Sequence, residues 1–337
     1  MNHHQSFYKN RKEEIMSRQK RLEEFSIDEL LKEVKSRSSK QESVATSCSV
    51  GQEALSDFKT NEIIEVLTSK QEVIYGTDNR MDIFQVTDQA IIDDADSVVA
   101  LFDVSDIVNN GNGTSTLKTQ NFGRDRNLCQ NEKFREQPTG AFCSGFLVAP
   151  NIIATAGHCV NAGNVTNIRF VFGFRMIDAS TVPNAINNTE IYKGLRLIGR
   201  EEEEDGPDWA LVQLDRPVTN HQSVRIRRAG KIEDNQAVHV IGHPVGIPTK
   251  FAGGADVREN NQDAFFIANL DTYGGNSGSP VFNSDTHEVE GILVRGETDF
   301  VGDGNCNISL VCPTTGCRGE DCTRTTEFAN HIPTIGD

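Results

Sequence analysis

Three residue types in this chain could perform chemistry together: the serine Ser277, the histidine His158 and the aspartate Asp208. A serine hydroxyl is a weak nucleophile at neutral pH and needs an adjacent base, and an imidazole has a suitable pKa of about 6.5. The imidazole in turn needs a carboxylate that fixes its tautomer and stabilises the imidazolium. The three residues lie in the segments Thr155-Ala156-Gly157-His158-Cys159, Asp208-Trp209-Ala210-Leu211-Val212 and Gly274-Gly275-Asn276-Ser277-Gly278-Ser279-Pro280. Together they predict nucleophilic attack of a serine on a carbonyl carbon.

The composition around Ser277 fits the same chemistry. The attacked carbonyl oxygen gains negative charge, which preorganised backbone N–H groups stabilise. Glycines beside the serine allow the backbone to turn such donors inward without a side-chain clash. Taken alone, each segment predicts little, because a single histidine is usually structural and a Gly/Ser-rich stretch is usually a loop. The prediction therefore depends on the combination.

The three segments resemble the His, Asp and Ser blocks of the chymotrypsin/trypsin clan of serine endopeptidases, and they follow one another in that clan's order. Within the clan they are similar to bacterial glutamyl endopeptidases of the V8 type. Residues 274–282 resemble the serine block of those enzymes, and Val73-Ile74-Tyr75-Gly76-Thr77-Asp78-Asn79-Arg80 resembles the start of their mature chain. The resemblance covers residues 73–337.

The resemblance implies a role for each candidate residue. Ser277 would attack the scissile carbonyl, His158 would take its proton and later protonate the leaving amine, and Asp208 would orient His158. The N–H groups of Gly275 and Ser277 would form the oxyanion hole. The resemblance also implies a disulfide between Cys143 and Cys159, closing the histidine loop. The expected function is that of a serine endopeptidase; the alternative is a catalytically silent homologue that binds a partner.

Substrate specificity is predicted from the position six residues before the nucleophile, which lies at the base of the S1 pocket in this clan. Here it is Asp271, followed by Thr272. An aspartate resembles trypsin and implies Arg or Lys at P1, whereas the alternative is that Asp271 pairs internally with a residue such as Arg295. Leu293 takes the place of a histidine of the glutamyl members, so glutamate specificity is not expected. The hypothesis is cleavage after basic residues.

The elements that must position these residues read as short strands. From Val73 onward, β-prone runs recur between Gly, Asn and Asp turns, and no helical pattern separates them, which favours an all-β barrel or sandwich. The resemblance implies two six-stranded antiparallel β-barrels, with the boundary near residues 216–236 and the active site in the cleft between them. The runs are Val98–Phe102, Gly145–Val148, Ile168–Phe172, Ala210–Leu214, Ala237–Ile241, Ala264–Ala268, Val281–Phe282 and Glu290–Val294.

Residues 1–72 precede this protease-like region of residues 73–337. Residues 8–40 are highly charged and look helical, and Ser26-Ile27-Asp28-Glu29 has the pattern of a capping box. We expect a mostly helical propeptide or regulatory extension, and therefore a zymogen cleaved between Glu72 and Val73. Asn276 replaces the aspartate that pairs with the new N-terminus in animal trypsins, so that ion pair is not expected.

Charge and composition limit the partners. The 337 residues have a net charge of −16, of which residues 1–40 contribute +3 and the remainder −19. A body this acidic repels nucleic acid and anionic membranes, and no apolar run of about 18 residues is present. We expect protein or peptide substrates and an activating protease as partners, with no nucleic acid and no membrane. No cofactor and no metal site are expected.

Eight cysteines favour an extracellular or other oxidising compartment, although no secretory signal peptide is recognisable behind Met1. A regulated intracellular protease is therefore the alternative. Near the C-terminus the spacing is wider than the C-x₂-C of zinc sites, so disulfides are favoured over zinc. Which of the remaining cysteines pair is not deducible from sequence: Cys48, Cys129, Cys306, Cys312, Cys317 and Cys322.

Overall fold

The computed structural model describes residues 74–333, with gaps at residues 183–184, 204–205, 296–298 and 314–316. The chain divides into the units Met1–Gln71 and Glu72–Asp337, and the following description concerns the second. The expected helical extension and the predicted cleavage point after Glu72 lie outside the described residues. Among the described residues, the α-helices are α4 (Gln89–Asp96) and α5 (Phe122–Asp125), and none is long and apolar enough to cross a membrane.

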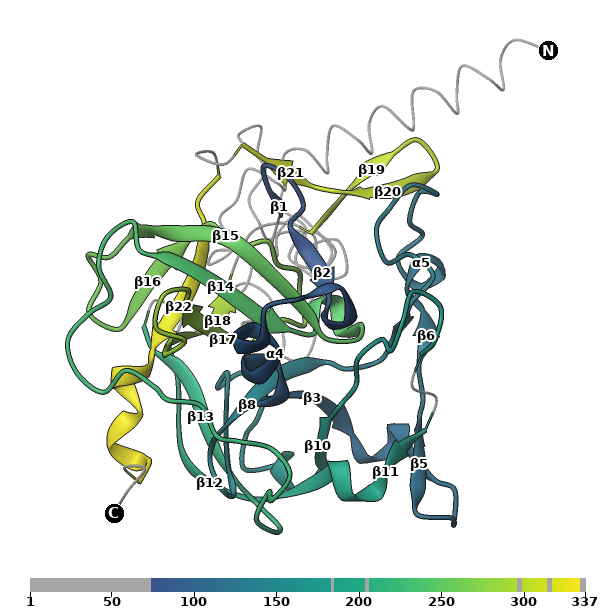
Figure 1. Ribbon diagram of the computed structural model, residues 1–337, viewed down its shortest axis with the longest axis horizontal. Helices are drawn as coiled ribbons and strands as arrows, with labels where there is room; N and C mark the ends of the chain where they lie inside the picture. Colours follow the sequence, from purple (N-terminus) through teal and green to yellow (C-terminus); the bar gives the residue numbers. More distant parts are fainter. Residues whose placement is uncertain (1–73, 183–184, 204–205, 296–298, 314–316, 334–337) are drawn as a thin grey trace, which may run out of the picture. The chain divides into compact units, whose positions relative to one another are not determined.

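A closed barrel of six antiparallel strands forms the first half of the unit, in the order β10-β12-β13-β9-β8-β3 (Figure 1). Its interior is filled by apolar side chains, among which Phe146, Phe170 and Phe172 are completely buried. Bulky aromatic and β-branched residues favour such a pleated, buried surface. The strands are β3 (Val98–Asp103), β8 (Cys143–Ala149), β9 (Ile152–Thr155), β10 (Ile168–Phe172), β12 (Ile191–Glu202) and β13 (Asp208–Leu214).

A second barrel follows, in the order β14-β17-β18-β22-β16-β15, and is closed by pairing of β14 with β15. Val240, Phe266, Val281 and Leu293 contribute to its buried core. The strand β2 (Arg80–Asp82) extends this sheet beyond β15. The barrel strands are β14 (Ala237–Gly242), β15 (Lys250–Glu259), β16 (Phe265–Ala268), β17 (Pro280–Asn283), β18 (Val289–Arg295) and β22 (Glu320–Arg324).

Four small sheets decorate the barrels. The first, of three strands, consists of β4 (Ile107–Asn109), β5 (Thr114–Leu117) and β11 (Ile186–Asn187). The others pair β1 (Ile74–Tyr75) with β21 (Val311–Cys312), β6 (Gln120–Asn121) with β7 (Pro138–Thr139), and β19 (Phe300–Asp303) with β20 (Cys306–Ser309).

Three disulfides connect these elements among the described residues. Cys143 is joined to Cys159, which confirms the pairing implied by the resemblance. Cys129 is joined to Cys306, so an insertion of the first barrel is linked to an insertion of the second. A further bridge joins Cys312 and Cys317, as expected from the preference for disulfides over zinc. Cys322 is buried in β22 and belongs to none of these bridges, and Cys48 lies outside the described residues.

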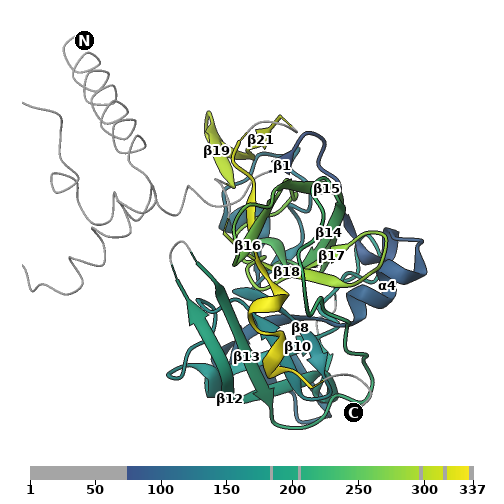
Figure 2. The ribbon, with the colours of Figure 1, turned by 90° about the vertical axis from the view of Figure 1, so that its left-hand side faces the viewer.

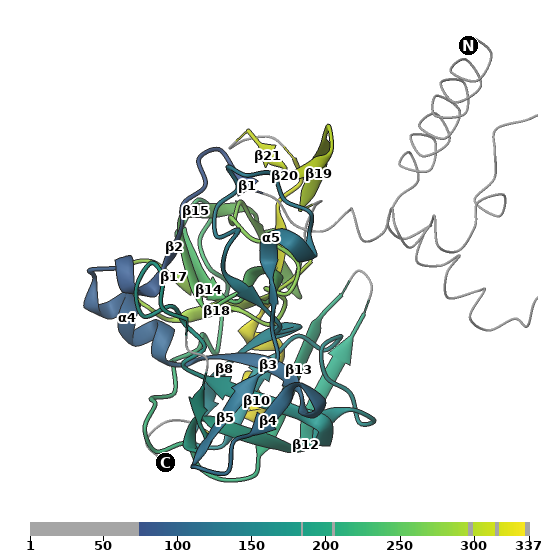
Figure 3. The same ribbon diagram turned by 90° about the vertical axis from the view of Figure 1, so that its right-hand side faces the viewer.

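Strands β8, β10, β12 and β13 of the first barrel lie on one side, and strands β14, β17 and β18 of the second barrel lie on the other (Figures 2 and 3). Residues of β8 and β13 contact the second barrel through hydrogen bonds. The Ser144 N–H donates to Ser277 O at 2.9 Å, and the Ser144 hydroxyl accepts from the His243 N–H at 2.9 Å. The Asp208 N–H donates to Thr323 Oγ1 at 3.1 Å. The predicted architecture of two six-stranded antiparallel barrels is confirmed, and residues 215–236 connect them.

Candidate active site

His158 lies on a short loop after β9 that neighbouring residues hold in place. Arg200 Nε donates to the carbonyl oxygens of Gly157 and Val160, both at 2.8 Å. A Cβ atom at Gly157 would lie 2.0 Å from the carbonyl oxygen of Glu201, so the close approach of loop and strand β12 requires glycine. The loop is therefore fixed by packing and hydrogen bonds before any substrate binds.

His158 and Asp208 contact each other through two hydrogen bonds. His158 Nδ1 lies 2.7 Å from Asp208 Oδ2, and the His158 main-chain N–H donates to Asp208 Oδ1 at 3.0 Å. Burial by itself raises the pKa of Asp208, but the hydrogen bonds and charge of His158 and the charge of Arg295 together lower it below its ordinary value. An ionised Asp208 keeps the proton of His158 on Nδ1, which leaves Nε2 as a proton acceptor.

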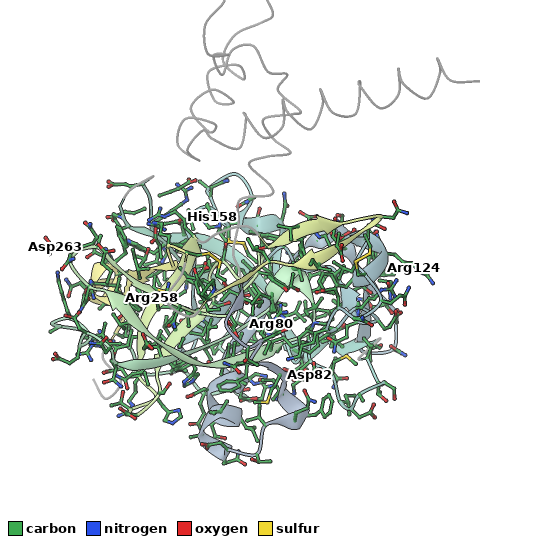
Figure 4. All side chains as sticks on the ribbon, turned by 90° about the horizontal axis from the view of Figure 1, so that it is seen from above. Arg80, Asp82, Arg124, His158, Arg258 and Asp263 are labelled. Carbon is green, nitrogen blue, oxygen red and sulfur yellow. A yellow bond between two sulfur atoms is a disulfide. The ribbon has the colours of Figure 1, made fainter. Side chains whose placement is uncertain are left out.

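Ser277 lies beside this pair in the turn that precedes β17. Its carbonyl oxygen is 3.7 Å from Sγ of Cys159, the residue directly after His158. Within the described residues, the Ser277 hydroxyl makes no hydrogen bond, and catalytic hydrogen bonds are often long before substrate binds. The His158 side chain retains 35% of its exposure and lies close to the surface (Figure 4), so the group is accessible to a substrate.

The turn around Ser277 also presents unused donors. No described residue accepts a hydrogen bond from the N–H of Gly275 or from that of Ser277, whereas the Gly278 N–H donates to Leu293 O at 2.8 Å. Gly275 has a φ of +89°, a left-handed conformation that favours glycine. These two N–H groups, two residues apart on one turn, are therefore the candidate donors to an oxyanion.

Asp271 is buried, and both of its carboxylate oxygens are occupied. Oδ1 accepts from the Tyr75 N–H at 2.7 Å, and Oδ2 accepts from the Asn79 N–H at 2.8 Å. Burial raises the pKa of Asp271 to about 6, despite these two hydrogen bonds. The neighbouring Thr272 is completely buried, and its Oγ1 has no partner among the described residues. Thr272 therefore offers an unused hydroxyl beside Asp271.

Asp271 does have internal partners, as the alternative expected, but they are the N–H groups of Tyr75 and Asn79 and not Arg295. Arg295 instead forms an ion pair with Asp321 at 3.2 Å and donates to the carbonyl oxygens of Glu203 and Gly206 at 2.8 Å. The last two residues belong to the loop that leads into β13, so Arg295 links β18 to the segment that precedes Asp208. Arg295 pairs with the buried Asp321 on β22, and Asp271 is bound by two main-chain donors instead.

Three supporting residues were missed in the sequence: Ser144, Arg200 and Thr323. Each contacts a loop of the site through a main-chain group, so its side-chain type alone is not diagnostic. Ser144 had one usable signal, because it directly follows the cysteine that was expected to bridge to the histidine loop.

The comparison with protein families agrees with this arrangement. Residues 143–292 match the family described as "Trypsin-like peptidase domain", and this range contains all three candidate catalytic residues. Residues 143–292 are therefore similar to a trypsin-like peptidase domain. No curated protein matches the chain.

Two solved proteases are similar to this peptidase at low sequence identity. The first is a Glu endopeptidase solved in complex with MPD, 17% identical, with 77% of this chain and 97% of that chain covered and a TM-score of 0.43. The second is the VesB protease of Vibrio cholerae, 14% identical, with 76% and 66% covered and a TM-score of 0.44. Both scores are too low to carry an argument, so the assignment rests on the family match and the strand topology.

The three disulfides of the peptidase fit an oxidising environment.

Proposed function

We propose that this peptidase is an endopeptidase that hydrolyses peptide bonds through an acyl-enzyme on Ser277. The observation that carries the proposal is the pair of hydrogen bonds between His158 and the buried Asp208, with Ser277 on the adjacent turn. A histidine held in this way is a base of fixed tautomer, and Ser277 is the nucleophile that we propose it activates.

The proposed reaction has two halves. Ser277 Oγ attacks the scissile carbonyl carbon while its proton passes to His158 Nε2, and the N–H groups of Gly275 and Ser277 stabilise the negative oxygen. The C–N bond then breaks, and His158 donates the proton to the leaving amine. A water molecule attacks the acyl-enzyme with His158 again as the base, which releases the acid product and restores the hydroxyl of Ser277. Asp208 remains ionised throughout.

A digest of a peptide library tests this proposal, with the wild-type chain beside Ser277→Ala. Cleavage by the wild type alone supports a serine endopeptidase and reports the P1 preference at the same time. Absence of cleavage by the wild type, together with tight binding of a peptide or protein, would favour a silent homologue that acts as a binding protein.

For P1 specificity, we propose that Asp271 favours basic side chains and that this preference is lost in acid. With a pKa of about 6, Asp271 is ionised at pH 8 and mostly protonated at pH 5. The ratio of kcat/KM for an arginine P1 substrate to that for its norleucine counterpart should therefore fall roughly tenfold over this range. A ratio of two substrates is the right measurement because a pH effect on the chemical step itself affects both substrates equally.

Asp271→Asn is the matched variant for this measurement. The substitution keeps a side chain of the same size beside Thr272, but it removes the charge and one of the two hydrogen bonds from Tyr75 and Asn79. Its substrate ratio should be low at pH 8 and independent of pH. A ratio that does not change with pH in the wild type, or a preference for acidic or large apolar P1 residues, would contradict the proposal.

The start of the mature chain is a separate proposal. Proteolysis between Glu72 and Val73 would leave a single residue before β1, where Ile74 is completely buried and the Tyr75 N–H donates to Asp271. Intact-mass and N-terminal sequence measurements on active material should therefore find Val73. The Ser277→Ala chain, produced in parallel, separates self-processing from cleavage by another protease. Fully active enzyme that retains Met1 would rule the proposal out.

A further inference from the structure

A second cluster of reactive side chains lies outside the active site. Asp94, His239 and His287 each offer one ligand-type atom, and the three atoms lie within 4.8 Å of one another. Asp94 Oδ2 lies 2.6 Å from His287 Nδ1 and 3.3 Å from His239 Nε2. The residues come from α4, from β14 and from the turn between β17 and β18, and the proteolytic mechanism uses none of them.

We propose that this cluster binds a divalent transition-metal ion of the zinc class. Two imidazole nitrogens and one carboxylate oxygen form a donor set that suits Zn²⁺, whereas Ca²⁺ and Mg²⁺ prefer oxygen ligands alone. Three protein ligands leave a fourth position for water. The sequence did not predict the site, because its ligands are separated by as many as 193 positions and share no motif.

The two distances from Asp94 fit such an ion after a small movement. Bonds of roughly 2.0 Å in a tetrahedron place neighbouring ligand atoms about 3.3 Å apart. The distance from Asp94 Oδ2 to His239 Nε2 is already 3.3 Å, which is just longer than an ordinary N–H···O hydrogen bond. The separation of Asp94 and His287 must increase by roughly 0.7 Å. His287 can make this movement because its side chain is 28% exposed and lies on a turn.

His239 is oriented in advance for metal binding. Its Nδ1 lies 3.1 Å from the hydroxyl oxygen of Ser284, which can accept the Nδ1 proton and leave the lone pair of Nε2 directed at Asp94. Second-shell acceptors of this kind fix the tautomer of metal-binding histidines. The ring is stacked on Phe282 at 5.1 Å and 12°, and its side chain is only 3% exposed, so it cannot turn away.

The acidic residues around the cluster favour a bound cation, and the place of the cluster between the barrels indicates that such an ion would stabilise the fold. α4 carries Asp93 and Asp96 beside Asp94, and it lies at the side of the molecule at the level where the barrels meet (Figures 2 and 3). Only Ser97 separates α4 from β3 of the first barrel, whereas His239 and His287 belong to the second. A bound ion would therefore tie the start of the first barrel to the second barrel and raise the unfolding temperature.

Zinc binding to the full chain tests the proposal. The Ser277→Ala chain prevents self-digestion and leaves the cluster intact; it is stripped with a chelator and titrated with zinc chloride by calorimetry. His287→Asn is the test variant, because asparagine tolerates the φ of +55° at this position but removes the imidazole. The parent should bind one more zinc ion than the variant. At saturating zinc its Tm should rise by roughly 5 °C, and the variant should lose this shift.

His331→Asn is the control, because His331 is exposed and packs against Trp209 at 5.5 Å, outside the cluster. It should bind zinc and gain stability as the parent does, and background binding to other histidines such as His3 and His4 is common to all three chains. Equal zinc stoichiometry and equal Tm shifts in the parent and His287→Asn would overturn the proposal. So would the absence of any zinc binding by the parent, which would leave the cluster as Asp–His hydrogen bonds only.

Discussion

Ser277→Ala is expected to lower kcat by about 10⁶, the largest effect of any single substitution in this chain. Without the hydroxyl no acyl-enzyme forms, and His158 has no group to activate. The free N–H groups of Gly275 and Ser277 are unaffected, so residual hydrolysis of roughly 10³–10⁴ over the uncatalysed reaction should remain. Initial rates with a fluorogenic peptide at saturating substrate measure the change, and KM should alter little because the binding surface is intact.

Ser279→Ala is the matched control for this loss. Ser279 is the other serine of the same turn, but it is completely buried and its hydroxyl donates to Asn276 Oδ1 at 3.1 Å. Losing that hydrogen bond should cost about tenfold at most. A large loss in Ser279→Ala with activity retained in Ser277→Ala would exchange the two roles. Equal activity of wild type and Ser277→Ala would remove the serine mechanism altogether.

Individual strands could be predicted because each is a local run of β-prone residues. That these strands close into two barrels was implied by the family resemblance. The run Val98–Phe102 corresponds to β3, and Glu290–Val294 lies within β18. The helix α4 was missed because it has only eight residues, half of them polar, and because its N-cap Asp88 resembles any turn residue. The small sheets were missed for the same reason, since strands of two to four residues carry almost no periodic pattern.

The candidate site likewise has residues that the sequence could predict and contacts that it could not. His158, Asp208 and Ser277 each sit in a recognisable local segment, so their roles could be predicted without coordinates. The partners of Asp271 could not, because Tyr75 and Asn79 are 196 and 192 positions away and bind through main-chain N–H groups that any residue possesses. Contacts of this kind are determined by how the barrels and their extensions pack, which no short segment encodes.

Asp208→Asn is expected to lower kcat by about 10⁴ while the fold is retained. Both oxygens of Asp208 accept hydrogen bonds, one from the His158 main-chain N–H and one from His158 Nδ1. An asparagine offers one acceptor and one donor, and keeping the main-chain bond turns its NH₂ group toward Nδ1. The imidazole then carries its proton on Nε2, where it cannot accept the proton of Ser277. Substrate binding should be nearly unchanged, so the loss falls on kcat rather than KM.

Two measurements separate this tautomer effect from simple damage to the fold. Asp215→Asn changes the first residue after β13, whose carboxylate accepts from the Lys193 N–H at 3.0 Å on the surface, and it should keep nearly full activity. Labelling with a fluorophosphonate should slow by a similar factor in Asp208→Asn, because the same proton transfer limits attack by Ser277. If Asp208→Asn kept more than a tenth of the wild-type kcat, the buried carboxylate would not be what orients His158. The two hydrogen bonds between these residues would then serve only to hold the loop after β9.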